Sequence, residues 1–386
     1  MRLKIYLLRM SEVFDIAILG AGVTGLRLTN RLLSQAGGDL RVALIGPVDA
    51  RQQRISFWHE VSQGHDYQAA IDGRWSAWDF RHRGCMMTQQ ARRCEYVSID
   101  ALVLKQQLEM QLASSQCYRL AAMVQQVSQS SLNFNIASEA GTVVARQVID
   151  TRTPYIPDNC LKQQFLGVEV ELTSPHGLKN PILMDFDITM VAADAVNFIY
   201  VLPIGEQRLF VEATIFSYDV AAKTDFYRAI DDWLDQHFAE SILRNDQHEA
   251  EFATIPMGQV RPIEPSLVGC GVGGGATRAS TGYAFKGAER QIQQLLLQAV
   301  SERRLQHVEA YSRRARLMDA IFLEVTKTDI QVLPELFGAM ASRLNGDDFA
   351  DFLSDSGGWG PLIRTILAAP KWPFIKAAGR LLVPRR

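Results

Sequence analysis

A glycine-rich turn between a short apolar strand and a helix is the feature that most constrains this chain. The apolar run Val13 to Leu19 predicts a β-strand, and the sequence GAGVTG follows it at once. In such a turn Gly20 permits the bend, Gly22 lets backbone N–H groups approach a pyrophosphate, and Gly25 lets the next helix pack closely on the strand. The helix N-terminus then faces the phosphates. The pattern predicts a dinucleotide-binding βαβ unit; a simple strand-to-helix turn is the alternative.

The acidic residue that usually completes this fingerprint is absent. The second strand, residues 41–46, ends in Gly46, where an Asp or Glu normally receives the ribose hydroxyls. Asp49 follows in the loop, and whether it replaces the missing acid stays open. The gap argues most against freely diffusing NAD, because that cofactor depends on this contact. A flavin held by many contacts over two domains tolerates the loss better.

The composition is that of an ordinary globular protein. A chain of 386 residues with a net charge of −2 suits one large or two medium domains, and nothing in its charge points to a nucleic-acid partner. Its five cysteines form no CxxC pair, so we expect small buried thiols in a reducing cytoplasm. The seven histidines lack metal-binding spacings, and we expect no metal site.

The pattern along the chain predicts a nucleotide-binding domain interrupted by a second domain. Period-two alternation and short apolar runs predict strands of an antiparallel sheet at residues 165–172, 182–187, 198–202 and 209–214. A helix over residues 223–238 follows, a strand near Leu267 returns the chain to the first domain, and the pattern beyond Arg303 is helical. We therefore expect an α/β fold made of a Rossmann-like domain (12–160 and 255–302), an inserted antiparallel-sheet domain (161–254) and a helical C-terminal region (303–386).

Two further segments are predicted to lie near the nucleotide. A strand over residues 143–150 ends in Asp150, and ligands of open α/β sheets bind at the carboxyl ends of the strands. A second glycine cluster, residues 269–275, is followed by a helix that we expect to start near Thr281.

Five short strings, in order and in register, resemble the sequences of bacterial lycopene β-cyclases. They are RISFW (54–58), SPHGL with PILMD (174–178 and 181–185), FIYVLP (198–203), LFVEAT (209–214) and STGY (280–283). Their order and spacing hold from about residue 13 to residue 375. The resemblance implies an FAD-binding fold of the glutathione-reductase or hydroxybenzoate-hydroxylase type, and a membrane-associated enzyme that cyclises a linear polyene.

The reaction that this resemblance implies is redox-neutral. A proton adds to an end-group double bond, a ring of the ionone type closes through a tertiary carbocation, and a proton leaves. The flavin is reduced in this family, with NAD(P)H as an open source of electrons, and it returns unchanged. An anionic flavin about 4 Å from a carbocation gains roughly 4 kcal/mol at an effective dielectric near 20. The alternative is a flavin-dependent monooxygenase or reductase of a hydrophobic polyene or terpenoid, which consumes NAD(P)H in each turnover.

Glu212 is the candidate proton donor. It matches the first acid of the family's acidic pair, and its apolar strand raises the pKa of a carboxyl group by desolvation. Ala213 stands at the place of the second acid, so either the chemistry differs or another carboxylate replaces it. Asp185 is the nearest candidate for that role, followed by Asp187; a structural role is equally open for both.

The resemblance also assigns residues to the cofactor. Gly271 and Gly275 match family glycines whose backbone approaches the flavin, and Thr281 and Gly282 open the helix beneath it. Arg278 stands where the family has His. Its guanidinium either faces the N1–C2 edge of the flavin, where it would stabilise the anionic reduced form, or points to solvent or a phosphate.

Aromatic residues are the candidates for contact with a polyene. Trp58, Tyr200, Tyr283 and Phe285 are expected to line a tunnel, since aromatic faces stabilise a passing cation; core packing is the alternative for each. The run 370–376 mixes Trp and Phe with Lys, which is typical of peripheral contact with a membrane surface, and a solvated tail is the alternative. We expect a cytoplasmic protein, with contact to the inner face of the cell membrane left open.

Overall fold

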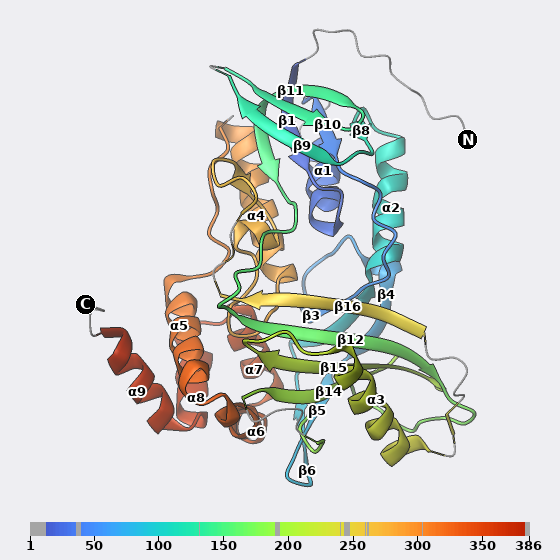
Figure 1. The fold of residues 1–386 in the computed structure, drawn as a ribbon, viewed down its shortest axis with the longest axis vertical. Helices are drawn as coiled ribbons and strands as arrows, with labels where there is room; N and C mark the ends of the chain where they lie inside the picture. The colour runs from blue at the N-terminus through green and yellow to red at the C-terminus, as the bar shows by residue number, and fades with distance from the viewer. Residues whose placement is uncertain are drawn as a thin grey trace.

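The chain forms two sheet-based lobes with a small third sheet between them (Figure 1). This computed structural model describes residues 13–35, 40–130, 132–189, 194–239, 241–242, 248–258, 260, 262–302 and 304–382. The upper lobe in Figure 1 holds the glycine-rich turn, and the lower lobe holds the antiparallel sheet with the C-terminal helices beside it. The expected α/β architecture is confirmed.

Parallel strands form the centre of the first sheet. Its strands, in the order β8-β2-β1-β11-β10-β9 with β17 beside β11, are β1 (Val13–Leu19), β2 (Val42–Ile45), β8 (Tyr118–Leu120), β9 (Val124–Gln129), β10 (Phe134–Ser138), β11 (Gly141–Asp150) and β17 (Val268–Gly269). β1 lies between β2 and β11 and is parallel to both. Three helices pack on one face, namely α1 (Val23–Gln35), α2 (Ala101–Ala113) and α4 (Phe285–Leu297).

Helix α2 begins where the sequence provides a cap. The Asp100 carboxylate accepts hydrogen bonds from the backbone N–H groups of Leu102 and Val103, which have no partner inside the helix. The strand before it, β7 (Cys94–Asp100), belongs to the small sheet with β3 (Arg54–Glu60) and β4 (Ile71–Trp75).

The second sheet is larger than the sequence predicts. Its strands, in the order β16-β12-β15-β14-β13-β5-β6, are β5 (Ala77–His82), β6 (Cys85–Gln90), β12 (Leu161–Glu171), β13 (Ile182–Asp185), β14 (Val196–Pro203), β15 (Arg208–Ser217) and β16 (His248–Met257). The hairpin β5–β6 comes from the segment that we assigned to the first domain. Strand β16 was not predicted, and it continues two residues past the expected boundary at residue 255.

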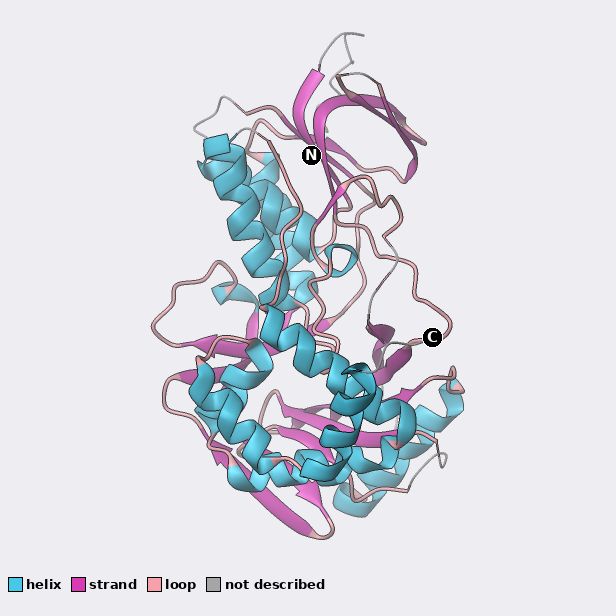
Figure 2. Cartoon of the chain, turned by 90° about the vertical axis from the view of Figure 1, so that its left-hand side faces the viewer, coloured by secondary structure: helices cyan, strands magenta, loops and turns pink. Residues whose placement is uncertain are grey.

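Helices cover both faces of this sheet. On one face, α3 (Lys223–Phe238) packs through Phe226, Ile230 and Trp233, and it spans the residues predicted for it. On the other face lie helices of the C-terminal region, which Figure 2 shows in front of the strands. Their bounds are α5 (Arg313–Thr328), α6 (Leu333–Arg343), α7 (Gly346–Ser354), α8 (Trp359–Ala368) and α9 (Lys371–Leu382).

Two helix starts differ from the prediction. Residues 281–284 form a turn, and α4 begins at Phe285 instead of near Thr281. Residues 304–312 are not helical, so the C-terminal helices start at Arg313 instead of Arg303. Within the part of the chain that the structure describes, none of the helices has the length and apolar character needed to cross a bilayer.

Candidate functional site

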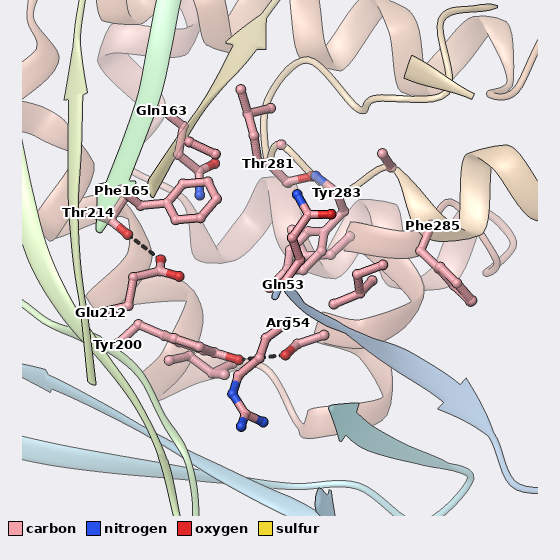
Figure 3. A pocket seen from close by; sticks show the side chains of 18 of the residues that line it. Gln53, Arg54, Gln163, Phe165, Tyr200, Glu212, Thr214, Thr281, Tyr283 and Phe285 are labelled. Atoms are coloured by element: carbon pink, nitrogen blue, oxygen red, sulfur yellow. Dashed lines mark hydrogen bonds between the residues drawn. The ribbon is translucent and has the colours of Figure 1, made fainter. Parts of the chain in front are cut away.

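A cavity of about 380 Å³ lies where the two lobes meet (Figure 3). The first lobe contributes Val23 and Thr24 of α1, part of the second glycine cluster, and the turn before α4. The antiparallel sheet contributes residues of β12, β14, β15 and β16, including Glu212. In Figure 3, Glu212 and Phe165 lie across the cavity from Thr281 and Tyr283. The cavity therefore joins the predicted nucleotide site to the predicted proton donor.

The glycine turn has the geometry that a bound pyrophosphate requires. Gly20 has φ +102°, and a Cβ there would lie 2.7 Å from Thr151 Oγ1. A Cβ on Gly25 would collide with the Gly20 carbonyl oxygen, so α1 packs closely on the turn. At Gly22 no heavy atom comes within 4 Å of such a Cβ, and this space lies before the N-terminus of α1. A phosphate group fits there, because the first N–H groups of a helix have no internal partners.

The structure explains the missing acid at Gly46. A Cβ on this residue would lie 2.7 Å from the Ala21 backbone nitrogen, because the end of β2 packs directly on the glycine turn. Any side chain here would require the turn to move. Asp49 is held by Arg51 and by Lys105, whose Nζ is 3.2 Å from Oδ2, and these hydrogen bonds lower its pKa to about 2 despite the opposing effect of burial. Asp49 does not line the cavity.

The second glycine cluster packs against the first. Gly271 has φ +78°, and a Cβ there would lie 3.0 Å from Thr24 Oγ1, at the first turn of α1. Gly275, with φ +80°, has open space on its Cβ side. Gly282 also has a positive φ and lies against the side chain of Gln163, whose Oε1 is buried without a hydrogen-bond partner. Gly271 and Gly282 line the cavity with protein packed against their Cβ sides, whereas Gly275 does not line it, so a role for Gly275 in cofactor binding stays a prediction.

Two of the predicted cofactor residues have other partners in this structure. Arg278 does not line the cavity, which corrects the expectation that its guanidinium faces a flavin edge. Its side chain is buried, with Nε 3.2 Å from Asp319 Oδ1 of α5 and Nη1 bonded to the Phe352 carbonyl oxygen. Asp150 ends β11 as predicted, and its carboxylate binds the backbone and side chain of Arg152. A role for Asp150 in cofactor binding stays a prediction.

Glu212 points from the middle of β15 into the cavity. The Thr214 hydroxyl donates a hydrogen bond to Glu212 Oε1 at 2.7 Å. Burial in the lining of the cavity raises the pKa of Glu212 to about 8. The Thr214 bond opposes this shift and a nearby Glu251 adds to it. This shift favours the protonated form of Glu212 near neutral pH, which is the form that a general acid needs.

Asp185 does not reach this cavity, which corrects its prediction as a second acid. It is 1% exposed. Trp233 Nε1 donates to Asp185 Oδ2 at 2.9 Å, and Arg81 Nη1 lies 3.6 Å from the same oxygen. It holds α3 on the sheet. Asp187 accepts a hydrogen bond from the Gly84 backbone N–H and also lies outside the cavity.

The predicted aromatic residues all line the cavity, but at two different ends. Tyr200 and Tyr283 surround the hydroxyl of Tyr96, at 3.0 and 3.5 Å, and the Tyr200 hydroxyl donates to Ser56 Oγ at 2.9 Å. Trp58 packs on this group, with its ring centre 5.1 Å from that of Tyr283.

Phe285 lies at the other end of the cavity. It stacks on Phe57 with ring centres 4.2 Å apart, and the Arg27 guanidinium lies 4.6 Å from its ring centre. Phe285 thus lies at the start of α4 beside α1, away from the tyrosine group, and its contact with the substrate stays a prediction.

Sequence reasoning missed several lining residues, among them Arg27, Tyr96, Gln163 and Glu251. Tyr96 lies in the unassigned stretch before α2, and Glu251 lies in the unpredicted strand β16. For Glu251 the available signal was the alternation in residues 251–257, where a charged residue occupies one face of a short apolar strand.

Comparison with solved structures identifies the fold as that of FAD-binding flavoproteins. A geranylgeranyl bacteriochlorophyll reductase-like protein from Thermoplasma acidophilum superposes with a TM-score of 0.60 at 15% identity, covering 96% of this chain and all of that one. HpxO of Klebsiella pneumoniae, solved with FAD and uric acid, gives a TM-score of 0.56 at 15% identity, covering 92% and 97%. At these identities the likeness shows the fold alone.

Sequence comparison is more specific. A lycopene beta-cyclase of Pantoea ananas is 29% identical over 214 residues, which are 53% of this chain and 53% of that protein. One from Paracoccus sp. is 42% identical over 55 residues, 14% of each chain. These matches thus span about half, or less, of the length of the curated relatives. The sequence model described as lycopene cyclase protein matches residues 15–377, nearly the whole chain, and the protein therefore belongs to the lycopene cyclase family.

Proposed function

We propose that this protein is an FAD-dependent, redox-neutral cyclase that closes an ionone-type ring on a linear carotenoid such as lycopene, or on a related isoprenoid polyene. One observation carries the proposal: a carboxyl group whose pKa is raised by burial points into an aromatic cavity that is bordered by the two glycine clusters. A hydrocarbon substrate would contact the apolar and aromatic part of this lining, and its cyclisation begins with a proton from a carboxyl group.

The residues present fit FAD. The open space at Gly22 and the N-terminus of α1 would hold the pyrophosphate, and Gly271 and Gly282, which line the cavity, would lie against the ring system. The buried Oε1 of Gln163 has no hydrogen-bond partner among the described residues, and it would accept a hydrogen bond from an N–H group of the ring system. When bound and reduced, the flavin would supply negative charge beside the cavity.

The cavity residues have three tasks in the proposed reaction. Glu212 delivers its proton to a terminal double bond of the polyene, and the cation that results attacks a second double bond to close the ring. The rings of Trp58, Tyr200 and Tyr283 present electron-rich faces to that cation. The apolar walls exclude water, which would otherwise capture the cation as an alcohol.

The test is expression of this chain in a bacterium that accumulates lycopene. The pigments are separated by chromatography and their molecular masses are measured by mass spectrometry. We expect cyclic carotenes isomeric with the substrate. Glu212→Gln keeps the shape and removes the proton, so cyclisation should fall about 100- to 10,000-fold with flavin content unchanged. In wild-type protein, activity should fall as pH rises through about 8, because the acid loses its proton there. Full activity of Glu212→Gln would contradict the assignment.

The alternative, a flavin monooxygenase or reductase, is separated by the electron balance. A p-nitrophenol 4-monooxygenase from Pseudomonas putida shares the fold, with a TM-score of 0.55 at 11% identity. A cyclase oxidises no stoichiometric NAD(P)H once its flavin is reduced. NADPH consumption equal to product, with a product heavier by oxygen or hydrogen, would establish the alternative.

We also propose that the substrate enters from a membrane through the C-terminal helices. A second cavity of about 350 Å³ lies between α5, α6, α7, α8 and α9, and its lining is almost wholly apolar. It shares Ser280, Thr281, Phe337 and Leu353 with the main cavity, so the two adjoin. Outside it, α8 and α9 expose Trp359, Ile363, Leu367, Trp372, Ile375 and Leu382.

A further inference from the structure

A second carboxyl group, that of Glu251, lies one strand beyond the neighbour of Glu212 in the sheet. Gly167 of β12 pairs with Glu212 of β15 on one side and with Glu251 of β16 on the other. Directly paired residues project to the same face of a sheet, so both carboxyl groups extend toward the cavity, from Cα atoms about 10 Å apart. Both residues line the cavity. Because Gly167 has no side chain, the ring of Phe210 packs over this residue.

The two carboxyl groups differ in their charged surroundings. Glu212 accepts a hydrogen bond from the Thr214 hydroxyl, and the negative charge of Glu251 raises the pKa of Glu212. Glu251 accepts a hydrogen bond from the Arg54 backbone N–H at 3.0 Å, and the cations of Arg51, Arg54 and Lys105 favour its ionised form. Arg54 itself pairs with Asp72 and Glu169, which reduces its effect.

The balance of these effects separates the two groups. Burial raises both pKa values, that of Glu212 to about 8 and that of Glu251 to about 7, where nearby cations oppose burial. The cations of Arg51, Arg54 and Lys105 favour the carboxylate form of Glu251. No cation of the described residues acts in this way on Glu212, so a proton shared by the pair is favoured on Glu212. Two carboxyl groups whose surroundings separate their titrations are the usual arrangement for an acid and a base in one reaction.

We propose that Glu251 is the base of the ring closure, which removes the proton that the cyclic carbocation must lose. The proposal rests on the proposed function. Glu212 gives a proton to the polyene and becomes a carboxylate. After the ring carbon–carbon bond has formed, a C–H bond next to the cationic carbon breaks, its electron pair forms the ring double bond, and its proton passes to the Glu251 carboxylate. The net reaction is an isomerisation, and proton exchange with solvent restores both groups.

The proposal also accounts for Ala213. In the family pattern this position carries the second acid. Alternation along β15 turns residue 213 to the α3 face, where Ala213 is 2% exposed among apolar side chains. A carboxyl group there would not reach the cavity. The second carboxyl of the cavity comes from β16 instead.

The test compares Glu251→Gln with wild type and with Glu171→Gln, a matched change at an exposed position of β12. For Glu251→Gln we expect kcat to fall at least about 100-fold with little change in KM, flavin content or Tm. In the wild type we expect activity to rise between pH 6 and pH 7.5, because Glu251 loses its proton there. This rise should disappear in Glu251→Gln. Residual product should carry the ring double bond at another carbon next to the cation, or a hydroxyl group, because no base directs proton loss.

Each remaining outcome decides the matter. Wild-type kcat, pH profile and product in Glu251→Gln would overturn the proposal, and the Glu212 carboxylate would then be the base. If Glu251→Gln does not fold, Glu251→Asp replaces it, and retention of the rising pH limb at lower kcat supports the proposal. Loss of that limb in Glu251→Asp with unchanged product would count against it.

A readout without substrate separates this proposal from the proposed function. The infrared carbonyl band of protonated carboxyl groups, titrated between pH 6 and pH 9, should lose one component in Glu212→Gln and a different, lower-pH component in Glu251→Gln. Absence of the second component would overturn the assignment of Glu251. Absence of cyclic product from the wild type would overturn the proposed function instead.

Discussion

At Gly22 the fingerprint turn leaves a space that the described protein atoms do not fill, whereas at Gly25 the protein itself fills it. We therefore expect Gly22 to matter for cofactor binding and Gly25 to matter for the packing of the fold. Gly22→Ala adds a methyl group where the pyrophosphate would lie, so we expect weaker FAD binding with Tm nearly unchanged. Gly25→Ala forces α1 away from Gly20, so we expect a lower Tm as well. Flavin absorbance after gel filtration and thermal unfolding of the apoprotein measure the two effects.

The opposite result would also be informative. Full flavin retention in Gly22→Ala would show that the pyrophosphate does not approach this residue, and the cradle would have to be placed elsewhere. Gly64→Ala is a suitable control for the effect of a glycine change, because Gly64 is exposed, has no positive φ, and has open space on its Cβ side.

At the scale of the strand, the period of two decides which residues meet the substrate. On β15, Phe210, Glu212 and Thr214 face the cavity, while Leu209, Val211 and Ala213 face α3. Ala213→Asp, which restores an acid to the position of the family pair, is therefore expected to give no gain in cyclisation. It buries a carboxyl group among apolar side chains and should destabilise the protein by several kcal/mol.

Denaturant unfolding and pigment analysis check this expectation together. A matched change on the same face of the neighbouring strand, Leu166→Asp, should be similarly destabilising, since Leu166 pairs with Ala213 and is fully buried. If Ala213→Asp instead raised the cyclisation rate without loss of stability, residue 213 would have to reach the cavity, and the alternation argument would be wrong.

Local patterns predicted most of the elements, and the failures share a physical cause. The βαβ unit, α3 and the strands over 161–217 have strong periodicity, so their types and approximate places were correct. Strand β16 and the hairpin β5–β6 are weakly patterned, and their pairing partners are distant in sequence. The start of α4 was placed too early, because hydrogen bonds between Arg278 and residues 281–283 hold this segment in a turn before the helix begins.

The site shows the same division. Glu212 was identified from its apolar strand and its family string, both of which are local. Glu251 and Tyr96 enter the cavity only through long-range strand pairing, and Arg278 is directed away from it by Asp319 of α5. Single-sequence reasoning contains no information on such contacts, so it found one carboxyl group of the cavity and misplaced the second.

At the scale of the whole molecule, α9 connects the apolar second cavity to the surface. Phe374 and Ile375 line that cavity, while Trp372 is 65% exposed beside Lys371, Lys376 and the nearby Arg380. Exposed Trp and aliphatic side chains with cations around them match the interface of a membrane rich in anionic lipids. We therefore expect the protein to sediment with vesicles that contain phosphatidylglycerol, and binding to weaken as salt rises.

The double change Trp372→Ser with Leu382→Ser removes two exposed apolar side chains of α9 that do not line the second cavity. At about 1 kcal/mol or more for each side chain, vesicle affinity should fall on the order of 30-fold. Val220→Ser is the control, because Val220 is 78% exposed in the loop before α3. Cyclisation of a polyene dissolved in detergent should survive the double change, whereas cyclisation of a polyene held in vesicles should fall with the affinity. Equal vesicle binding by the double variant would place the membrane contact on another surface, and the second cavity would then lose its role as the substrate entrance.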